Sequence, residues 1–388
     1  MKLQKGFTLL ELMVSMAIVV SVVAIATDAL MQAEHVTTMV AYEANTQQNL
    51  RSGMHFLVRD LVQAGEGIPQ GGVSIPYVGA NSAIVRPGAG ANFPATYTTL
   101  PAITPGSRLG QLATSLNPTT GATLTGVATD IINVLYADNV LVDAAGNYLY
   151  SYPIIQTAPS TPVCAGTISG TGASVTLAAG CFTMPGKTNP ITTGNLMMFH
   201  NQNGTALEYV TSVAGQTINF VGGDPAGLNQ TGDANGTVAA LATSPGVFPP
   251  TTITRVWMVT YYIDATNVQD PQLIRQVNYP GYPAGAPVNP PIAIADDIEN
   301  LGFSYDITSS TDAAGTYTNG PGNAAQPILP DTPDQIRAVN IFLAARSEYT
   351  YTAESAPQYL RSNLSSQVSI RSLSFTNQFQ TSFTATAP

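Results

Sequence analysis

The first part of the chain shows two hydrophobic patterns in succession, a continuous apolar run and then a helical spacing of apolar residues. Residues 7–27 form an apolar run of 21 positions that contains one charged side chain, Glu11. As a helix, this run would measure about 31 Å, which matches the ~30 Å hydrocarbon core of a bilayer. Farther on, apolar residues recur at steps of four, three and four: Leu50, Met54, Leu57 and Leu61. This spacing predicts that the helix continues in amphipathic form toward residue 65.

From residue 66 onward, apolar and polar residues alternate in short runs separated by Gly, Pro, Asn and Ser. Such runs predict β-strands. The clearest lie at 129–138, 207–213, 216–221, 255–263, 301–307 and 336–345. The alternation changes parity between Ile370 and Leu373, which predicts a bulge or a turn. We therefore expect an α+β fold: a long N-terminal helix, then a large antiparallel β-sheet domain with long loops at 86–126 and 222–250.

Proline and glycine place a boundary between these two parts. All 28 prolines occur from Pro69 onward, and all but three of the 34 glycines occur after residue 65. Proline interrupts helices and glycine weakens them. The helix should therefore end within 65–72, and residues 66–388 should form a separate β-rich domain.

The charge of the chain narrows its possible partners. The formal net charge is −10, and only 9% of the residues are charged. Tight non-specific binding of nucleic acid needs a basic surface that displaces counterions from phosphates. We therefore expect no nucleic-acid partner.

The two cysteines, Cys164 and Cys181, lie 17 positions apart. In an exported protein, this spacing predicts a disulfide that closes a small loop and contributes about 3 kcal/mol in the chain-entropy model. Two free thiols are the alternative. A zinc site is disfavoured because none of the three histidines has finger spacing to the cysteines.

The sequence lacks the motifs of the common enzyme classes, such as G-x-S-x-G, H-E-x-x-H and Walker A. His200 is the only histidine after residue 65, and a lone histidine beside an apolar strand is more often structural than catalytic. Two acidic groups could bind Ca²⁺: Asp296, Asp297 and Glu299, and Asp264 with Asp270. Neither has the alternating ligands of a calcium loop, so solvated surface charge is favoured. We expect no enzymatic activity, no cofactor and no metal.

The N-terminus has the features of a membrane anchor. Lys2 and Lys5 keep it in the cytoplasm by the positive-inside rule, and residues after 28 then lie outside. The end of the apolar run, at Thr27 and Asp28, lacks a small-residue cleavage site. A simple membrane anchor does not explain Glu11, because a charge at the centre of a membrane helix costs roughly 2.5–3.5 kcal/mol.

The stretch KGFTLLELMVSMAIV resembles the N-terminus of type IV pilins and of their minor-pilin and pseudopilin relatives. The resemblance implies that a prepilin peptidase cuts after Gly6 and that Phe7 becomes N-methylated. The domains would then be a leader at 1–6, a transmembrane half-helix at 7–28, an amphipathic half-helix at 29–65 and a periplasmic or extracellular domain at 66–388. The resemblance also implies that Glu11 pairs with the Phe7 amine of a neighbouring subunit. Position near the lipid headgroups, without any partner, is the alternative for Glu11.

A second stretch, QQNLRSGMHFLVRDLVQAGEG at 47–67, resembles the end of the long helix in PilW-like minor pilins. The residues that carry it are Arg59, Asp60, Leu61, Ala64 and Gly65. The C-terminal third is similar to the same proteins more weakly, and the region 86–250 resembles nothing we can name. The resemblance implies a non-enzymatic minor pilin that primes pilus assembly and ends at or near the pilus tip. A pilus-tip adhesin and a minor pseudopilin of type II secretion are the alternatives.

The same resemblance implies the partners and the location of the protein. Its partners would be other minor pilins, the major pilin, the prepilin peptidase and the inner-membrane assembly platform. Before assembly, the chain would cross the inner membrane once, with its N-terminus cytoplasmic and its bulk periplasmic. After assembly, it would lie at the pilus tip on the cell surface.

Overall fold

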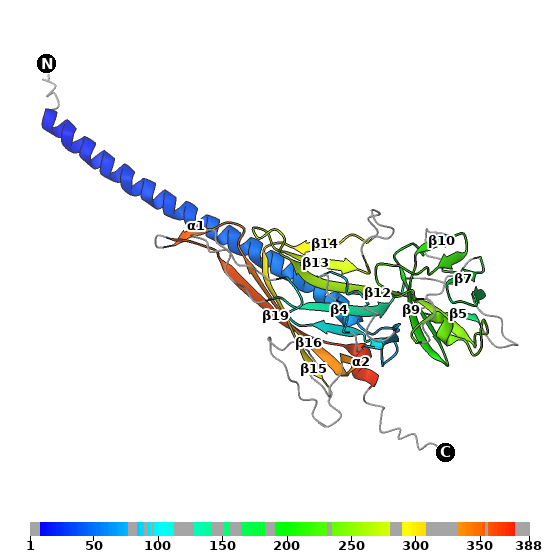
Figure 1. Cartoon of the computed structure of the whole chain (residues 1–388). Coiled ribbons are helices and arrows are strands. Elements are labelled where there is room, and N and C mark those ends of the chain that lie inside the picture. The colour runs from blue at the N-terminus through cyan, green and yellow to red at the C-terminus, as the bar shows by residue number, and fades with distance from the viewer. Residues whose placement is uncertain are drawn as a thin grey trace.

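One helix dominates the computed structural model of the chain. Helix α1 (Leu9–Gln63) has 55 residues, and its first half projects alone from a β-rich body (Figure 1). The structure describes residues 8–76, 84–88, 92–94, 97–111, 128–140, 151–155, 164–179, 181–182, 191–230, 235–279, 289–307, 333–353 and 356–376. The α+β fold expected from the sequence is confirmed.

The end of α1 is fixed by its contact with the sheet. Ala64 follows the last helical residue, and Gly65 takes a left-handed conformation with φ of +79°. A side chain on Gly65 would be strained in this conformation and would meet Ala102 at 3.2 Å. The Gly65 N–H also donates to the carbonyl of Leu135 at 2.9 Å. The helix therefore stops where its backbone joins a strand.

The larger sheet is antiparallel and has eight strands around β12 (Thr251–Asp264). The C-terminal half of β12 pairs with β13 (Gln272–Val277) and β4 (Ile131–Ala137). Its N-terminal half pairs with β8 (Leu196–Asn201) and β5 (Tyr152–Ile155). The sheet is completed by β3 (Ile103–Gly106), β9 (Gly204–Tyr209) and β14 (Ile292–Ala295). Because β12 spans 14 residues, it connects two lobes of the body.

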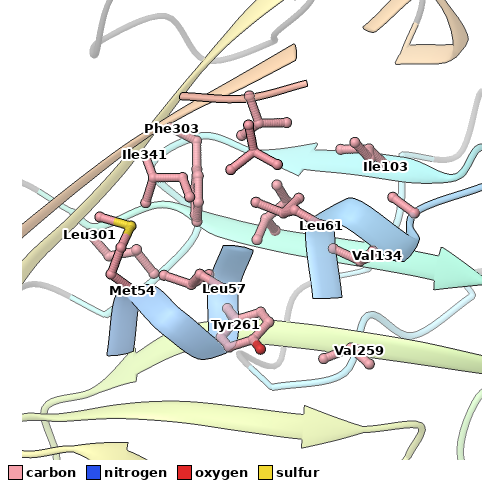
Figure 2. Packing of buried hydrophobic residues seen from close by; sticks show 14 of the residues in the cluster. Met54, Leu57, Leu61, Ile103, Val134, Val259, Tyr261, Leu301, Phe303 and Ile341 are labelled. Atoms are coloured by element: carbon pink, nitrogen blue, oxygen red, sulfur yellow. The ribbon is translucent and has the colours of Figure 1, made fainter. Parts of the chain in front are cut away.

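A second sheet lies on the other side of α1. Its order is β15 (Ile298–Ile307), β16 (Ile336–Arg346) and β19 (Arg361–Ser369), all antiparallel. The predicted helical stripe enters the space between the sheets: Leu50, Met54, Leu57 and Leu61 are buried in one cluster with side chains of both. Figure 2 shows Met54, Leu57 and Leu61 among residues of β4, β12, β15 and β16. The C-terminal part of α1 is thus a core helix.

The helix also covers an edge of the larger sheet. Ser52 Oγ donates to the carbonyl of Ile294 at 3.0 Å, and Asn49 Nδ2 donates to the carbonyl of Asp296 at 3.2 Å. These two carbonyls belong to edge strand β14 and the residue after it. Unpaired edge groups invite pairing with other chains, so covering them stabilises the fold and blocks aggregation.

Gly53 marks the closest approach of helix and sheets. A Cβ on this residue would lie 2.8 Å from Leu273 Cδ2 and 3.6 Å from Leu343 Cδ1. Sequence alone makes Gly53 a weak point worth about 1 kcal/mol of helix propensity. The structure gives it a positive role, because the missing side chain lets α1 pack against β13 and β16.

The second lobe lies at the end of the body farthest from the start of α1 (Figure 1). It has its own buried cluster, which includes Val175, Phe199 and Phe220. A four-stranded antiparallel sheet belongs to it, in the order β10 (Ser212–Ala214), β11 (Thr217–Asn219), β7 (Ser174–Leu177) and β6 (Gly166–Ile168). The smaller elements of the chain are β1 (Val73–Ser74), β2 (Thr99–Leu100), β17 (Tyr351–Ala353), β18 (Ala356–Gln358), α2 (Arg371–Thr376), and two 3₁₀ turns, η2 (Val238–Leu241) and η3 (Pro333–Gln335).

A disulfide joins Cys164 and Cys181 in this lobe, with their Cα atoms 5.3 Å apart. Cys164 is buried, and the rings of Tyr152 and Phe182 pack in the same cluster, tilted by 46° with centroids 4.3 Å apart. The bridge closes the loop that contains β6 and β7.

Non-reducing mass spectrometry of the exported protein should therefore find one peptide pair linked through Cys164 and Cys181. Reduction should lower the stability of the second lobe by about 3 kcal/mol. Material exported in the native host that contains two free thiols would contradict the bridge.

Three details differ from the sequence-based expectations. Segment 207–213, expected as one strand, is divided between β9, which ends at Tyr209, and β10, which begins at Ser212. Strand β3 and the short β2 lie inside 86–126, which the composition indicated as a loop. Strand β3 is the buried segment ITPG, where proline and glycine obscure the alternation. The parity change near Ile370 is a turn: β19 ends at Ser369, and α2 begins at Arg371.

Candidate functional site: the N-terminal helix and its anchor

The start of α1 is built by a reciprocal pair of side chains. Thr8 Oγ1 accepts from the backbone N–H of Glu11 at 3.3 Å, and Glu11 Oε2 accepts from the backbone N–H of Thr8 at 3.1 Å. The Thr8 hydroxyl also donates to Oε2, at 3.1 Å. This is a capping box, which satisfies N–H groups that a helix start leaves open. Glu11 therefore has a local role at the helix start, which the sequence analysis missed although T-x-x-E is its signal.

The capping box leaves part of the Glu11 carboxylate for another molecule. Both bonds from Thr8 end on Oε2, and no described residue donates to Oε1. The helix dipole favours a negative charge at this position. Gly6 and Phe7, the expected cleavage and methylation positions, lie outside the described residues.

The first half of α1 projects from the body (Figure 1). Every residue from Thr8 to Thr38 is exposed, and α1 is the one described helix long and apolar enough to cross a membrane. Large apolar side chains stand in the open along it, such as Leu12 at 56% and Ile25 at 72% exposure. In water this surface would be unfavourable, so lipid or other helices must cover it.

The exposed apolar surface continues beyond the segment that lipid would cover. Leu30, Met31, Val36 and Val40 follow Asp28 and are 58–71% exposed. The buried part of the helix begins only at Thr46. Residues 29–45 therefore form a largely exposed section of about 25 Å, at 1.5 Å per residue, between the apolar run and the buried part of the helix. The body reaches the end of this section, where the rings of Tyr42 and Tyr349 lie 6.0 Å apart.

The other end of α1 is anchored by Asp60, whose side chain is completely buried. Its Oδ2 accepts from the Tyr261 hydroxyl of β12 and from Arg275 Nε of β13, both at 2.6 Å. Its Oδ1 accepts from its neighbour Arg59 at 3.1 Å. A buried carboxylate with these charged and neutral donors is strongly stabilised relative to an unpaired one.

The anchor shifts the titration of the groups around it. Burial, together with the negative charge of Asp60, raises the pKa of Tyr136 to about 12. The same two causes raise the pKa of Tyr261. Burial alone would lower the pKa of Arg275, but its bond to Asp60 more than offsets this and raises it. At neutral pH the site therefore contains neutral tyrosines beside a carboxylate that two arginines, Arg59 and Arg275, contact.

The acidic groups considered for calcium lie around a cleft beside α1. Asp270, Asp296 and Asp297 line this cleft, whereas Glu299 pairs with Arg361 at 2.8 Å. Asp264 does not line it and accepts instead from the N–H of Thr266. Among the described residues, no group of three or more His, Cys, Asp or Glu side chains could hold a metal ion.

His200, the remaining candidate, lies on β8 with its side chain exposed. Its backbone carbonyl accepts from the Thr252 hydroxyl of β12 at 3.3 Å. His200 thus contributes to the contact between β8 and β12 through its backbone. Among the described residues, the anchor of α1 around Asp60 contains no histidine.

The described geometry is that of an exposed apolar helix, long enough to cross a membrane, that is docked by its C-terminal part into a β-rich body. The comparison with known families adds one finding: residues 1–27 match the family of the prokaryotic N-terminal methylation motif. No curated protein and no solved structure matches the chain. The N-terminus is therefore a type IV pilin-like prepilin leader followed by its membrane helix, which supports a pilin-like or pseudopilin-like protein and favours a structural role.

Proposed function

We propose that the protein is a PilW-like minor pilin that helps to prime type IV pilus assembly and is incorporated at or near the pilus tip. The observation that carries this proposal is the exposed apolar helix with Glu11 at its start, directly after a prepilin-type leader. Cleavage after Gly6 would create an amine on Phe7, four positions from Glu11. Oε1 of Glu11 could then bind the amine of a neighbouring subunit while Thr8 holds Oε2.

The section 29–45 supports assembly with other helices. Lipid would cover the helix up to about residue 28, so Leu30, Val36 and Val40 need a different apolar partner. The N-terminal helices of other pilin-type subunits would supply such a partner if they resemble α1. In this proposal, the chain first crosses the inner membrane once, with its body periplasmic, and the assembly platform then passes it into the filament.

The size of the body favours the tip over the shaft. Residues 66–388 include two lobes, and the second extends away from the helix (Figure 1). A shaft of thousands of subunits would bring such bodies into contact at every helical repeat. A single copy at the end of the filament meets no such restriction.

The second lobe favours one alternative function, a tip adhesin. Its separate buried cluster and its disulfide make it a stable unit at the end farthest from the membrane helix. A ligand-binding module at a pilus tip would occupy this position. The third candidate function is that of a minor pseudopilin of type II secretion, which would have the same kind of leader and membrane helix as a minor pilin.

Deletion of the gene in the native host separates these three functions. We expect surface pili to disappear and to return when the wild-type chain is supplied from a plasmid. Normal pili with lost attachment would favour the adhesin. Normal pili with lost protein secretion would favour the pseudopilin. Either outcome would refute the priming role.

A further inference from the structure

An open cleft of about 760 Å³ lies where α1 leaves the body. The helix supplies one wall through polar residues such as Asn45 and Asn49. The loops after β14 and β16 supply the other walls, including Asp296 and Glu348. The cleft therefore opens beside the end of section 29–45.

The lining of the cleft has an excess of negative charge. Four carboxylates line it, from Asp270, Asp296, Asp297 and Glu348, against one cation, Arg346. Arg346 is 1% exposed, and two carbonyls, those of Val268 and Gln269, accept from its Nη2. It forms the floor of the cleft, so the opening is acidic.

The carboxylates are only partly satisfied within the chain. Gln272 Nε2 donates to Asp270 Oδ2 at 3.1 Å and to Asp296 Oδ1 at 3.0 Å. Among the described residues, Arg346 is the one cation that pairs with Asp297. Asp297 is 6% exposed, its Oδ1 has no hydrogen-bond donor, and Arg346 Nε lies 3.8 Å away. Asp270 Oδ1 is also buried without a donor. Burial and the nearby carboxylates raise the pKa of Asp297 to about 6 in spite of Arg346. A buried acceptor without a donor is costly, so a donor from outside would be favourable here.

We infer that this cleft receives a lysine or arginine side chain from the N-terminal helix of a neighbouring pilin-type subunit. A positive group fits the excess of carboxylates, and long basic side chains can cross the ~8–10 Å between packed helices. A metal ion fits less well, because the described carboxylates do not converge on one point. The inference rests on the proposed function, since it requires a helix packed beside α1.

The expected pairing of Glu11 sets the level at which that side chain must lie. If the neighbour's fifth residue meets the Phe7 amine, the two parallel helices are offset by four residues, or about 6 Å. The cleft borders α1 at residues 42–49. The neighbour then presents residues about 40–47 of its own mature chain at this level.

Helix α1 of this chain itself has an exposed basic side chain near this level. Arg51 is exposed and would be about the 45th residue after leader removal. Arg51 and Asn49 are two positions apart, which places them roughly 200° apart around α1. One side of the helix therefore faces the acidic cleft while the other presents an arginine, as a head-to-tail arrangement of subunits requires.

The test is photo-crosslinking in cells that express the full chain with its natural partners. p-Benzoylphenylalanine replaces Thr350, an exposed residue on the rim of the cleft. We expect a crosslink to the N-terminal helix of another pilin-type protein. The crosslinked position should lie within about ten residues of a Lys or Arg among residues about 40–47 of that protein's mature chain. The pair Asp296→Asn and Glu348→Gln should lower the yield at least fivefold. The matched pair Asp264→Asn and Asp306→Asn, which removes two charges elsewhere, should leave it unchanged.

A second probe position, Val36, separates this inference from the proposed function. Crosslinks from Val36 but none from Thr350 would overturn the cleft inference and leave the pilin role intact. An absence of crosslinks from both positions would count against both. Equal loss with the two double variants would show that net charge, not the cleft, attracts the partner. If Glu348→Lys abolishes the crosslink and a Lys-to-Glu or Arg-to-Glu change in the partner restores it, the contact is assigned.

Discussion

Asp60→Ala is expected to lower the free energy of unfolding by about 3–5 kcal/mol, the usual effect of removing one partner of a buried ion pair. The change leaves Arg275, with only 15% of its side chain exposed, without its carboxylate. It also leaves the buried hydroxyl of Tyr261 without its acceptor. Because both partners belong to the larger sheet, the loss should loosen the contact between α1 and that sheet first.

Unfolding can be followed in detergent-solubilised full-length protein by the fluorescence of Trp257, the only tryptophan, which lies on β12. Hydrogen exchange should increase most in residues 46–63 of α1. The matched control is Arg59→Ala, because Arg59 contacts the same carboxylate with a side chain that is 44% exposed. Exposed ion pairs contribute about 0–1 kcal/mol, so this control should be nearly silent. Equal losses for the two variants would show that Asp60 is not the anchor.

Glu11→Val is expected to leave the protein in the membrane but to reduce its incorporation into filaments by about ten- to a hundredfold. Valine suits lipid better than a carboxylate, so insertion should not suffer. A hydrogen bond to a charged group contributes about 1.5–3 kcal/mol, and each 1.4 kcal/mol corresponds to a factor of ten. The measurement compares the chain in sheared surface filaments with the chain in membranes. Mass spectrometry of the membrane fraction should show a mature chain that begins at methylated Phe7.

The capping box requires its own control. Thr8→Ala removes the hydroxyl that caps the helix, at a cost of about 1 kcal/mol, but retains the carboxylate of Glu11. This variant should enter filaments at nearly the normal level. If it fails as severely as Glu11→Val, then Glu11 acts within its own helix start and the pairing between subunits is wrong.

The sequence predicted those features that depend on neighbouring residues. The stripe from Leu50 to Leu61 is helical because its spacing repeats over adjacent turns, and its burial follows from that spacing. β12 and β16 were recognisable because each alternates over many residues. β3 was not, because it is short and contains Pro105 and Gly106. Local spacing determines an element only when the element is long enough to repeat it.

The anchor could not be predicted, for a different reason. Asp60 meets Tyr261 and Arg275 across 201 and 215 residues of chain, and nothing near Asp60 indicates that its carboxylate is buried. The cleft is similar, since Asp270 and Asp296 come from separate loops that only the fold brings together. The capping box of Thr8 and Glu11 could be recognised from four consecutive residues. It was overlooked because Glu11 was considered only for contacts with another chain or with the lipid headgroups.

The continuity of α1 has a mechanical consequence. No proline or glycine interrupts it between Leu9 and Ser52, so a pull on the body is transmitted along the rod to its lipid-embedded end without a hinge that could absorb it. The bonds of Asp60, Ser52 and Asn49 to the sheets resist such a pull together, because they act along one stretch of the same helix. Extraction from the bilayer should therefore draw out the whole rod before the body comes apart.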